Sequence, residues 1–242
     1  VNVWVHFANA MLFLCLARQQ GISLPFAGIA ALLFLANTSH YRAIFWISAI
    51  SLVFGVFFVL LSLTISGRKG IAWQVGSVVC YCASMLFHQT MGIAALLTPL
   101  LIARKCPLRR RLQVLASYLV PGVLLLVLER WLYGGTFAED DNYVLLGVHV
   151  VINLAKYLFG LFVGGYSGGF GHPNPPVQIA VITGAILVVA MLALLLRTDT
   201  RLWALWVILA TVPFCFWDRG QIFSRYFYFP AVASSGLLAI GL

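Results

Sequence analysis

The stretch that decides the fold runs from Trp73 to Arg111 and reads WQVGSVVCYCASMLFHQTMGIAALLTPLLIARKCPLRRR. It contains two apolar runs separated by a polar break that includes His88 and Gln89. It ends in a cluster of five basic residues, which are Arg104, Lys105, Arg109, Arg110 and Arg111. Lysine and arginine accumulate on the cytoplasmic side of membrane proteins. The cluster therefore predicts the inner side of a membrane, and it places His88 and Gln89 on the outer side.

The composition of the whole chain also indicates a membrane protein. Of its 242 residues 62% are hydrophobic and only 9% are charged, whereas soluble domains carry about 25% charged residues. The net charge of +9 does not indicate nucleic acid binding, because the basic residues lie at the ends of apolar runs instead of forming one face with interleaved aromatic residues. We therefore predict an all-α, polytopic transmembrane helical bundle that binds no nucleic acid.

The apolar runs predict about nine spans, because several approach the roughly 20 residues that cross a bilayer. The segment 145–163 is predicted instead to lie in the membrane interface, because His149, Asn153, Lys156 and Gly160 form a stripe at helical spacing. Together these elements predict a single transmembrane domain over 1–242, which we expect to be a fragment of a longer chain. The predicted spans cover residues 1–17, 22–37, 43–66, 71–87, 90–103, 112–132, 177–196, 202–216 and 226–242.

The distribution of charge supports this topology. With the spans alternating in direction, the outer side carries five basic and five acidic residues, while the inner side carries ten basic residues against Asp199, a net charge of +9. All of the net charge therefore lies on the predicted inner side, as the positive-inside rule expects. The ten basic residues are Arg18, Arg68, Lys69, Arg104, Lys105, Arg109, Arg110, Arg111, Arg197 and Arg201.

The remaining polar side chains gather near the predicted outer side, so we expect a functional site to open there. Asn2, His6 and Asn9 share one face of the first helix. Such a stripe indicates either hydrogen bonds between helices or the wall of a wet cavity. Known short catalytic motifs and zinc-ligand spacings do not occur in the sequence.

The segment from Ser224 to Pro230, SRYFYFP, is the most specific string in the chain. An arginine at the outer end of a helix, followed by tyrosines, has the forked donors that bind phosphate. An ordinary interfacial anchor has the same composition, because arginine extends to the headgroups and tyrosine lies at their level. The residues alone leave both interpretations open.

Four short motifs occur in a characteristic order along the chain. They are Asn2-x-x-x-His6, the polar turn Asn37-Thr38-Ser39-His40, the pair His88-Gln89 before a run with Pro99, and Arg225-Tyr226-x-Tyr228-x-Pro230. As an ordered set they resemble multipass glycosyltransferases of the GT-C class, in particular protein O-mannosyltransferase-like and related bacterial enzymes. The resemblance implies transfer of a sugar from a polyprenyl-phosphate carrier to an acceptor glycan, lipid or protein outside the bacterial cytoplasmic membrane.

The resemblance also implies roles for individual residues. Arg225 is expected to contact the carrier phosphate, with Arg219 second. The family's acidic residue, which acts as a base or binds a divalent metal ion, would precede Val1, and Asp140 and Asp141 are the acidic candidates within this chain. No metal ligand is assigned. The expected substrate-binding residues are Arg225, Tyr226, Arg219, His88, Gln89, His6, His40 and Arg42.

Two other functions stay open at this point. A transporter or flippase for a lipid-linked saccharide predicts charged residues at mid-membrane and helices broken in paired halves. A noncatalytic membrane scaffold is the third interpretation, because His88-Gln89 stands where relatives in the resembled class often carry Lys-Glu.

Overall fold

A computed structural model describes residues 1–37, 39, 41–45, 47–102, 107–134, 147–163, 177–216 and 224–241. Within these ranges all the regular elements are helices, as the sequence predicts. The elements are α1 (Asn2–Gln19), α2 (Leu24–Ala36), α3 (Tyr41–Phe45), η2 (Ile47–Ala49), α4 (Ile50–Ser66), α5 (Ile71–Phe87), η3 (Gln89–Ile93), α6 (Ala94–Ile102), α7 (Leu108–Tyr133), α8 (Val148–Phe162), α9 (Val177–Leu196), α10 (Arg201–Cys215), η5 (Ser224–Phe227) and α11 (Tyr228–Gly241).

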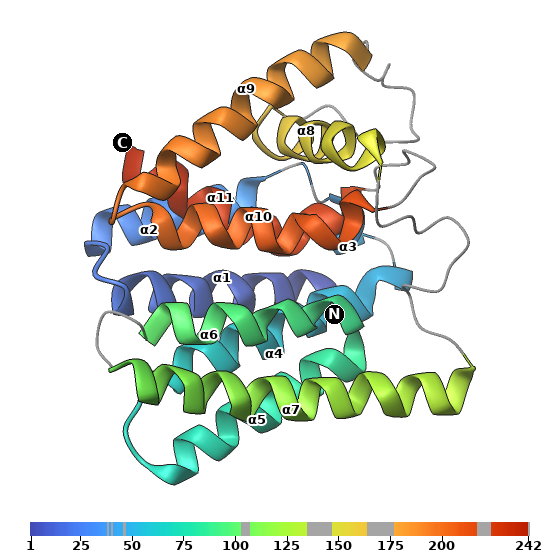
Figure 1. Cartoon of the computed structure of the whole chain (residues 1–242). Helices are drawn as coiled ribbons and strands as arrows, with labels where there is room; N and C mark the ends of the chain where they lie inside the picture. Colours follow the sequence, from blue (N-terminus) through green and yellow to red (C-terminus); the bar gives the residue numbers. More distant parts are fainter. Residues whose placement is uncertain are drawn as a thin grey trace.

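Helix α4 is central to the bundle and contacts α1, α5, α6 and α11. Figure 1 shows α7 next to α6 at one side of the bundle and α9 at the opposite edge of the molecule. The interior side of α4 is apolar and buried through Leu52, Val56 and Leu63. Because its sequence is apolar over nearly its whole length, α4 can be surrounded by other helices without leaving polar side chains unpaired.

Three helices among the described residues are long and apolar enough to cross a membrane, namely Ile47–Ser66, Leu108–Leu132 and Gln178–Leu196. The last two are mostly exposed, and they present large apolar side chains such as Val123 on α7 and Ile186 on α9. A water-soluble protein rarely exposes continuous apolar surface of this extent. The outward faces of α7 and α9 therefore suit contact with lipid.

The predicted spans 1–17, 71–87 and 202–216 correspond closely to α1, α5 and α10, but several others are shorter than the sequence suggested. Helix α2 has 13 residues, a length of about 20 Å, against the roughly 30 Å of a bilayer core. The predicted span 90–103 is divided between η3 and α6, and the predicted span 43–66 begins with the short elements α3 and η2. Apolar sequence continues beyond the α-helices into turns and 3₁₀ segments. An apolar run therefore predicts that a segment lies in apolar surroundings, but it does not give the residues at which the helix begins and ends.

The polar stripe of α8 faces the protein. The prediction of an interfacial helix assumed that this stripe faces water, and that assumption is wrong. Asn153 is buried, and its Nδ2 donates a hydrogen bond to the carbonyl oxygen of Cys215 on α10 (3.0 Å). Gly160 is also buried, and the ring of Phe227 of η5 occupies the space that a side chain at Gly160 would need. Val148 and Val151 are exposed instead. Helical spacing shows which residues share a face of the helix. Here that face packs against α10 and η5 instead of meeting water.

The bundle has two ends that differ in chemistry. The basic end contains the turns around residues 20–23, 67–70 and 197–200 together with the start of α7. Cavities there bring Gln20 close to both Lys69 and Asp199. The other end, here named the Arg225 end, contains α3, η3, η5 and the last turn of α10. Contacts of η5 with α3 and α10, and of η3 with α10, hold it together.

Candidate functional site

Arg225 is held at the Arg225 end by the aromatic residue that follows it. The half-buried Arg225 donates a hydrogen bond from Nη2 to the hydroxyl of Tyr226 (3.0 Å), and its guanidinium lies 4.9 Å from the centre of the same ring. Tyr226 is buried and stacks on Phe214 of α10, with ring centres 4.4 Å apart and an interplanar angle of 15°. The short element η5 thereby fixes the guanidinium beside α10.

His88 lies between α5 and η3 at the same end as Arg225. Burial, together with the positive charge of Arg225, lowers the pKa of His88 from 6.5 to about 4. A hydrogen bond joins its Nδ1 to Oγ1 of Thr90 (2.7 Å). Gly55 of α4 faces this turn, where an added Cβ would lie 3.2 Å from Cγ of Met91 and in ordinary contact, 3.5 Å, with Cβ of His88. His88 is therefore neutral near pH 7, and it lies within electrostatic range of Arg225.

Tyr157 of α8 completes this cluster, although sequence reasoning did not single it out. Its ring packs against Phe214 (6.1 Å between ring centres) and edge-on against Phe227 (5.5 Å). The charge of Arg225 also acts on the Tyr157 hydroxyl, which is buried and has no hydrogen-bond partner among the described residues. The sequence held part of the signal for Tyr157, because this residue is adjacent to Lys156 of the polar stripe. The stripe was predicted to face the membrane interface instead of the protein.

His6 belongs to a hydrogen-bonded network inside the bundle. Nδ2 of Asn9 donates to the Tyr228 hydroxyl (2.9 Å) and to the carbonyl oxygen of Val53 (3.1 Å). The Tyr228 hydroxyl then donates to Nδ1 of His6 (2.8 Å), while Nε2 of His6 donates to the carbonyl oxygen of Leu35 (3.4 Å). These contacts match the neutral tautomer of His6 that carries its proton on Nε2. The interpretation of the polar stripe as hydrogen bonding between helices is confirmed for His6 and Asn9.

The remaining predicted site residues are placed only in part. Gln89 begins η3 and is half-buried beside His88. Arg42 lies in α3, which contacts η5, but its side chain is outside the described structure. His40, Asp140, Asp141 and Arg219 lie outside the described residues. Within the described ranges, no group of three or more His, Cys, Asp or Glu side chains forms a metal site.

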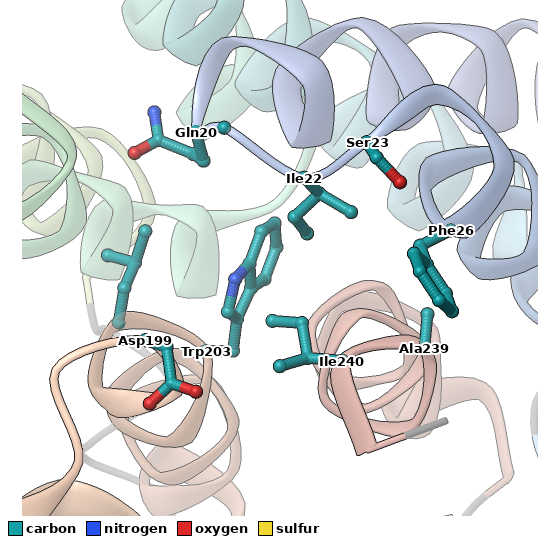
Figure 2. Close-up of a pocket in the computed structure, with 10 residues that line it drawn as sticks. Gln20, Ile22, Ser23, Phe26, Asp199, Trp203, Ala239 and Ile240 are labelled. Atoms are coloured by element: carbon teal, nitrogen blue, oxygen red, sulfur yellow. The ribbon is translucent and has the colours of Figure 1, made fainter.

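Cavities lined by described residues lie near both ends of the bundle. One of about 390 Å³ lies between the start of α1 and residues 44–50. Two others lie at the basic end, so they are not the outward-opening site that the sequence predicts. Figure 2 shows one of them, with a volume of about 360 Å³, where Trp203 lies between Ile22 and Ile240. The carboxylate of Asp199 at its edge pairs with Arg197 (3.1 Å).

The Arg225 cluster, defined as Arg225, Tyr226, His88 and Tyr157, has the chemistry of an anion site. Arginine supplies a permanent charge with forked donors, and neutral histidine and tyrosine hydroxyls supply further hydrogen bonds. Comparison with protein-family models, curated proteins and solved structures finds no match to this chain.

Proposed function

We propose that this protein is a multi-pass glycosyltransferase of the bacterial cytoplasmic membrane, which moves a sugar from a polyprenyl-phosphate carrier to an acceptor on the outer face. The observation that carries the proposal is that Arg225 and His88 lie at one end of the bundle, within electrostatic range of each other. The opposite end holds the basic turns, which matches the positive-inside arrangement. A phosphate at the outer headgroup level would then meet the Arg225 cluster.

The Arg225 cluster suits a phosphate that is bound and released. Arg225 would hold the phosphate oxygens through its forked donors, and its contact with Tyr226 limits the directions in which it can point. Since His88 is neutral, it adds a hydrogen bond without adding a second full charge that would hold the leaving phosphate too tightly. Tyr157 supplies a further hydroxyl close to the same guanidinium.

In the proposed reaction, the bond between the anomeric carbon of the sugar and a phosphate oxygen of the carrier breaks. The phosphate leaves with the electron pair, while an acceptor oxygen forms the new bond to that carbon. The acceptor proton passes to a carboxylate acting as general base. Glu129 and Asp199 are the carboxylates within the described residues. Asp140 and Asp141 remain candidates for this role, and a carboxylate outside this chain is the alternative.

The phosphate role of Arg225 is tested with the variant Arg225→Ala. We expect it to weaken binding of a polyprenyl phosphate by about 10- to 100-fold, because a hydrogen bond to a charged group contributes roughly 1.5–3 kcal/mol. The first measurement is the dissociation constant of polyprenyl phosphate for the purified protein in phosphatidylcholine nanodiscs. The second is the release of polyprenyl phosphate when the protein is supplied with a panel of polyprenyl-phosphate hexoses.

The matched control is Arg130→Ala, which removes a positive charge from the exposed last turn of α7. It should leave binding unchanged, and both variants should unfold at the temperature of the parent protein. Equal binding by Arg225→Ala and the parent would remove Arg225 from the site. Movement of the intact saccharide across a vesicle without release of polyprenyl phosphate would favour a flippase instead.

A further inference from the structure

The basic end of the bundle contains a cavity that is lined by several cationic side chains. This cavity, of about 420 Å³, lies where the end of α1, the α4–α5 turn and the starts of α5 and α7 converge. Among the described residues, Arg68, Lys69 and Arg110 line it and no carboxylate does. This arrangement uses residues that the proposed transferase reaction does not require.

The arginines of this cavity are oriented by neighbouring side chains. The guanidinium of Arg68 lies over the ring of Trp73 with 4.4 Å to its centre. Nη2 of Arg110 donates a hydrogen bond to Oε1 of Gln74 (3.2 Å). Both partners lie in the first turn of α5. Anchoring of this kind reduces the side-chain entropy that is lost when a ligand is bound.

The inner wall of the cavity is apolar and firmly held. Leu63, Leu101 and Val114 line it together with Tyr118. The Tyr118 hydroxyl is hydrogen-bonded to Oγ of Ser77, which in turn donates to the carbonyl oxygen of Ser62 (2.6 Å). This network ties α4, α5 and α7 together beneath the cations. The cavity therefore offers positive charge at its mouth and hydrocarbon at its base.

Apolar side chains are exposed on the helices that line the cavity. Val75 follows Gln74 on α5, and Leu108 and Leu112 lie on the side of α7 that faces away from Arg110. A soluble ion would use only the charged mouth of the cavity. A phospholipid would use the charged mouth, the apolar base and this outer surface together.

We propose that this cavity binds the phosphate headgroup of an anionic phospholipid in the inner leaflet, with an acyl chain lying against α5 and α7. The shared chemistry with a soluble ligand is the phosphate itself, and the apolar base favours the lipid. Basic pockets between membrane helices on the cytoplasmic side are suited to such headgroups.

The test is a titration of the purified full chain in detergent with phosphatidylglycerol, phosphatidylcholine or inorganic phosphate, followed by native mass spectrometry. We expect retention of phosphatidylglycerol over phosphatidylcholine. The variant Arg68→Gln/Lys69→Gln/Arg110→Gln should lose roughly fivefold in affinity for each charge removed. The matched control Arg18→Gln/Arg197→Gln/Arg201→Gln removes three charges from the same end outside the cavity, and it should retain the parent affinity.

Three results would overturn the proposal. Equal losses in the two triple variants would show general charge attraction. Retention of inorganic phosphate to the same extent as phosphatidylglycerol, with mutual competition, would identify a site for a soluble ion. Unchanged affinity in the cavity variant would show that the lipid binds elsewhere. If that variant does not accumulate, Lys69→Gln on the exposed turn replaces it, with an expected loss of about fivefold against Arg201→Gln.

Discussion

At His88, burial and the charge of Arg225 act in the same direction, because both disfavour the imidazolium form. The unfolded chain has no such environment, so there the pKa returns to 6.5. Below that pH the unfolded state takes up a proton that the folded state does not. His88 therefore lowers stability as the pH falls from 6.5 towards 4, and its contribution is constant above that range.

We expect this effect to be visible in the pH dependence of unfolding. A difference of two to three pKa units corresponds to about 3 kcal/mol between pH 7 and pH 4. The variant His88→Asn keeps a hydrogen-bonding side chain next to Thr90 but cannot titrate in this range. The decline in thermal unfolding temperature with acid should therefore be smaller in the variant. Parallel profiles for the two proteins would show that His88 does not titrate as described.

The sequence predicted which end of the bundle a residue lies at. It did not predict which side chains a residue packs against. His88 and Arg225 were expected at one end because alternating spans place both there, and they are neighbours in the electrostatic sense. Tyr157 and Tyr228 were not expected to have these roles. A buried tyrosine and an interfacial one have the same sequence surroundings. The Tyr228 hydroxyl accepts a hydrogen bond from Asn9 on a helix distant in the sequence, and Tyr157 packs against rings from α10 and η5.

Among the elements, α8 and α9 pack most closely at a glycine. A Cβ at Gly184 of α9 would overlap the carbonyl oxygen of Ala155 on α8. Backbone cannot move aside as a flexible side chain does, so the two helices would have to separate. Gly28 of α2 is different, because no atom lies within 4 Å of a Cβ placed there.

This contrast gives a paired prediction for Gly184→Ala and Gly28→Ala. The first should lower the free energy of unfolding by about 1–3 kcal/mol, the usual cost of overpacking. The second should be neutral or slightly stabilising, because alanine is the better helix former. Thermal unfolding followed by tryptophan fluorescence in detergent measures both. Equal stability of the two variants would mean that α8 and α9 are not packed at this glycine.

Element positions followed from the apolar runs because a helix forms wherever a long apolar segment must satisfy its own backbone. Element surroundings did not follow. The stripe containing Asn153 and Gly160 was correctly placed on one face of a helix, yet periodicity cannot show whether that face meets water or another helix. The structure pairs Asn153 with Cys215.

For the whole molecule, the orientation in the membrane remains a prediction, and two engineered cysteines test it. In a background without native cysteines, Asp140→Cys should react with a membrane-impermeant maleimide in intact cells. Gly67→Cys, on the exposed turn between α4 and α5, should react only after the membrane is permeabilised. The reverse pattern would invert the molecule and place the Arg225 cluster inside the cell.

The two-ended charge pattern was predictable because it depends on helix order alone. Arg68 and Lys69 of the α4–α5 turn and Arg110 of α7 come together at one end. The cavity that they form was not predictable, since it depends on how far the helix ends diverge. Three helices reach spanning length within the described residues. The number of crossings therefore depends on how shorter helices such as α2 are accommodated.

The bond between Asn9 and Tyr228 joins the first helix to the last one across 219 residues. A ribosome adding 5–20 residues per second needs roughly 10 to 45 s to deliver that tyrosine after the asparagine has emerged. During this interval α1 has been synthesised, but α11, which carries its hydrogen-bond partner Tyr228, has not. Helix α1 therefore cannot complete its packing before α11 has been synthesised.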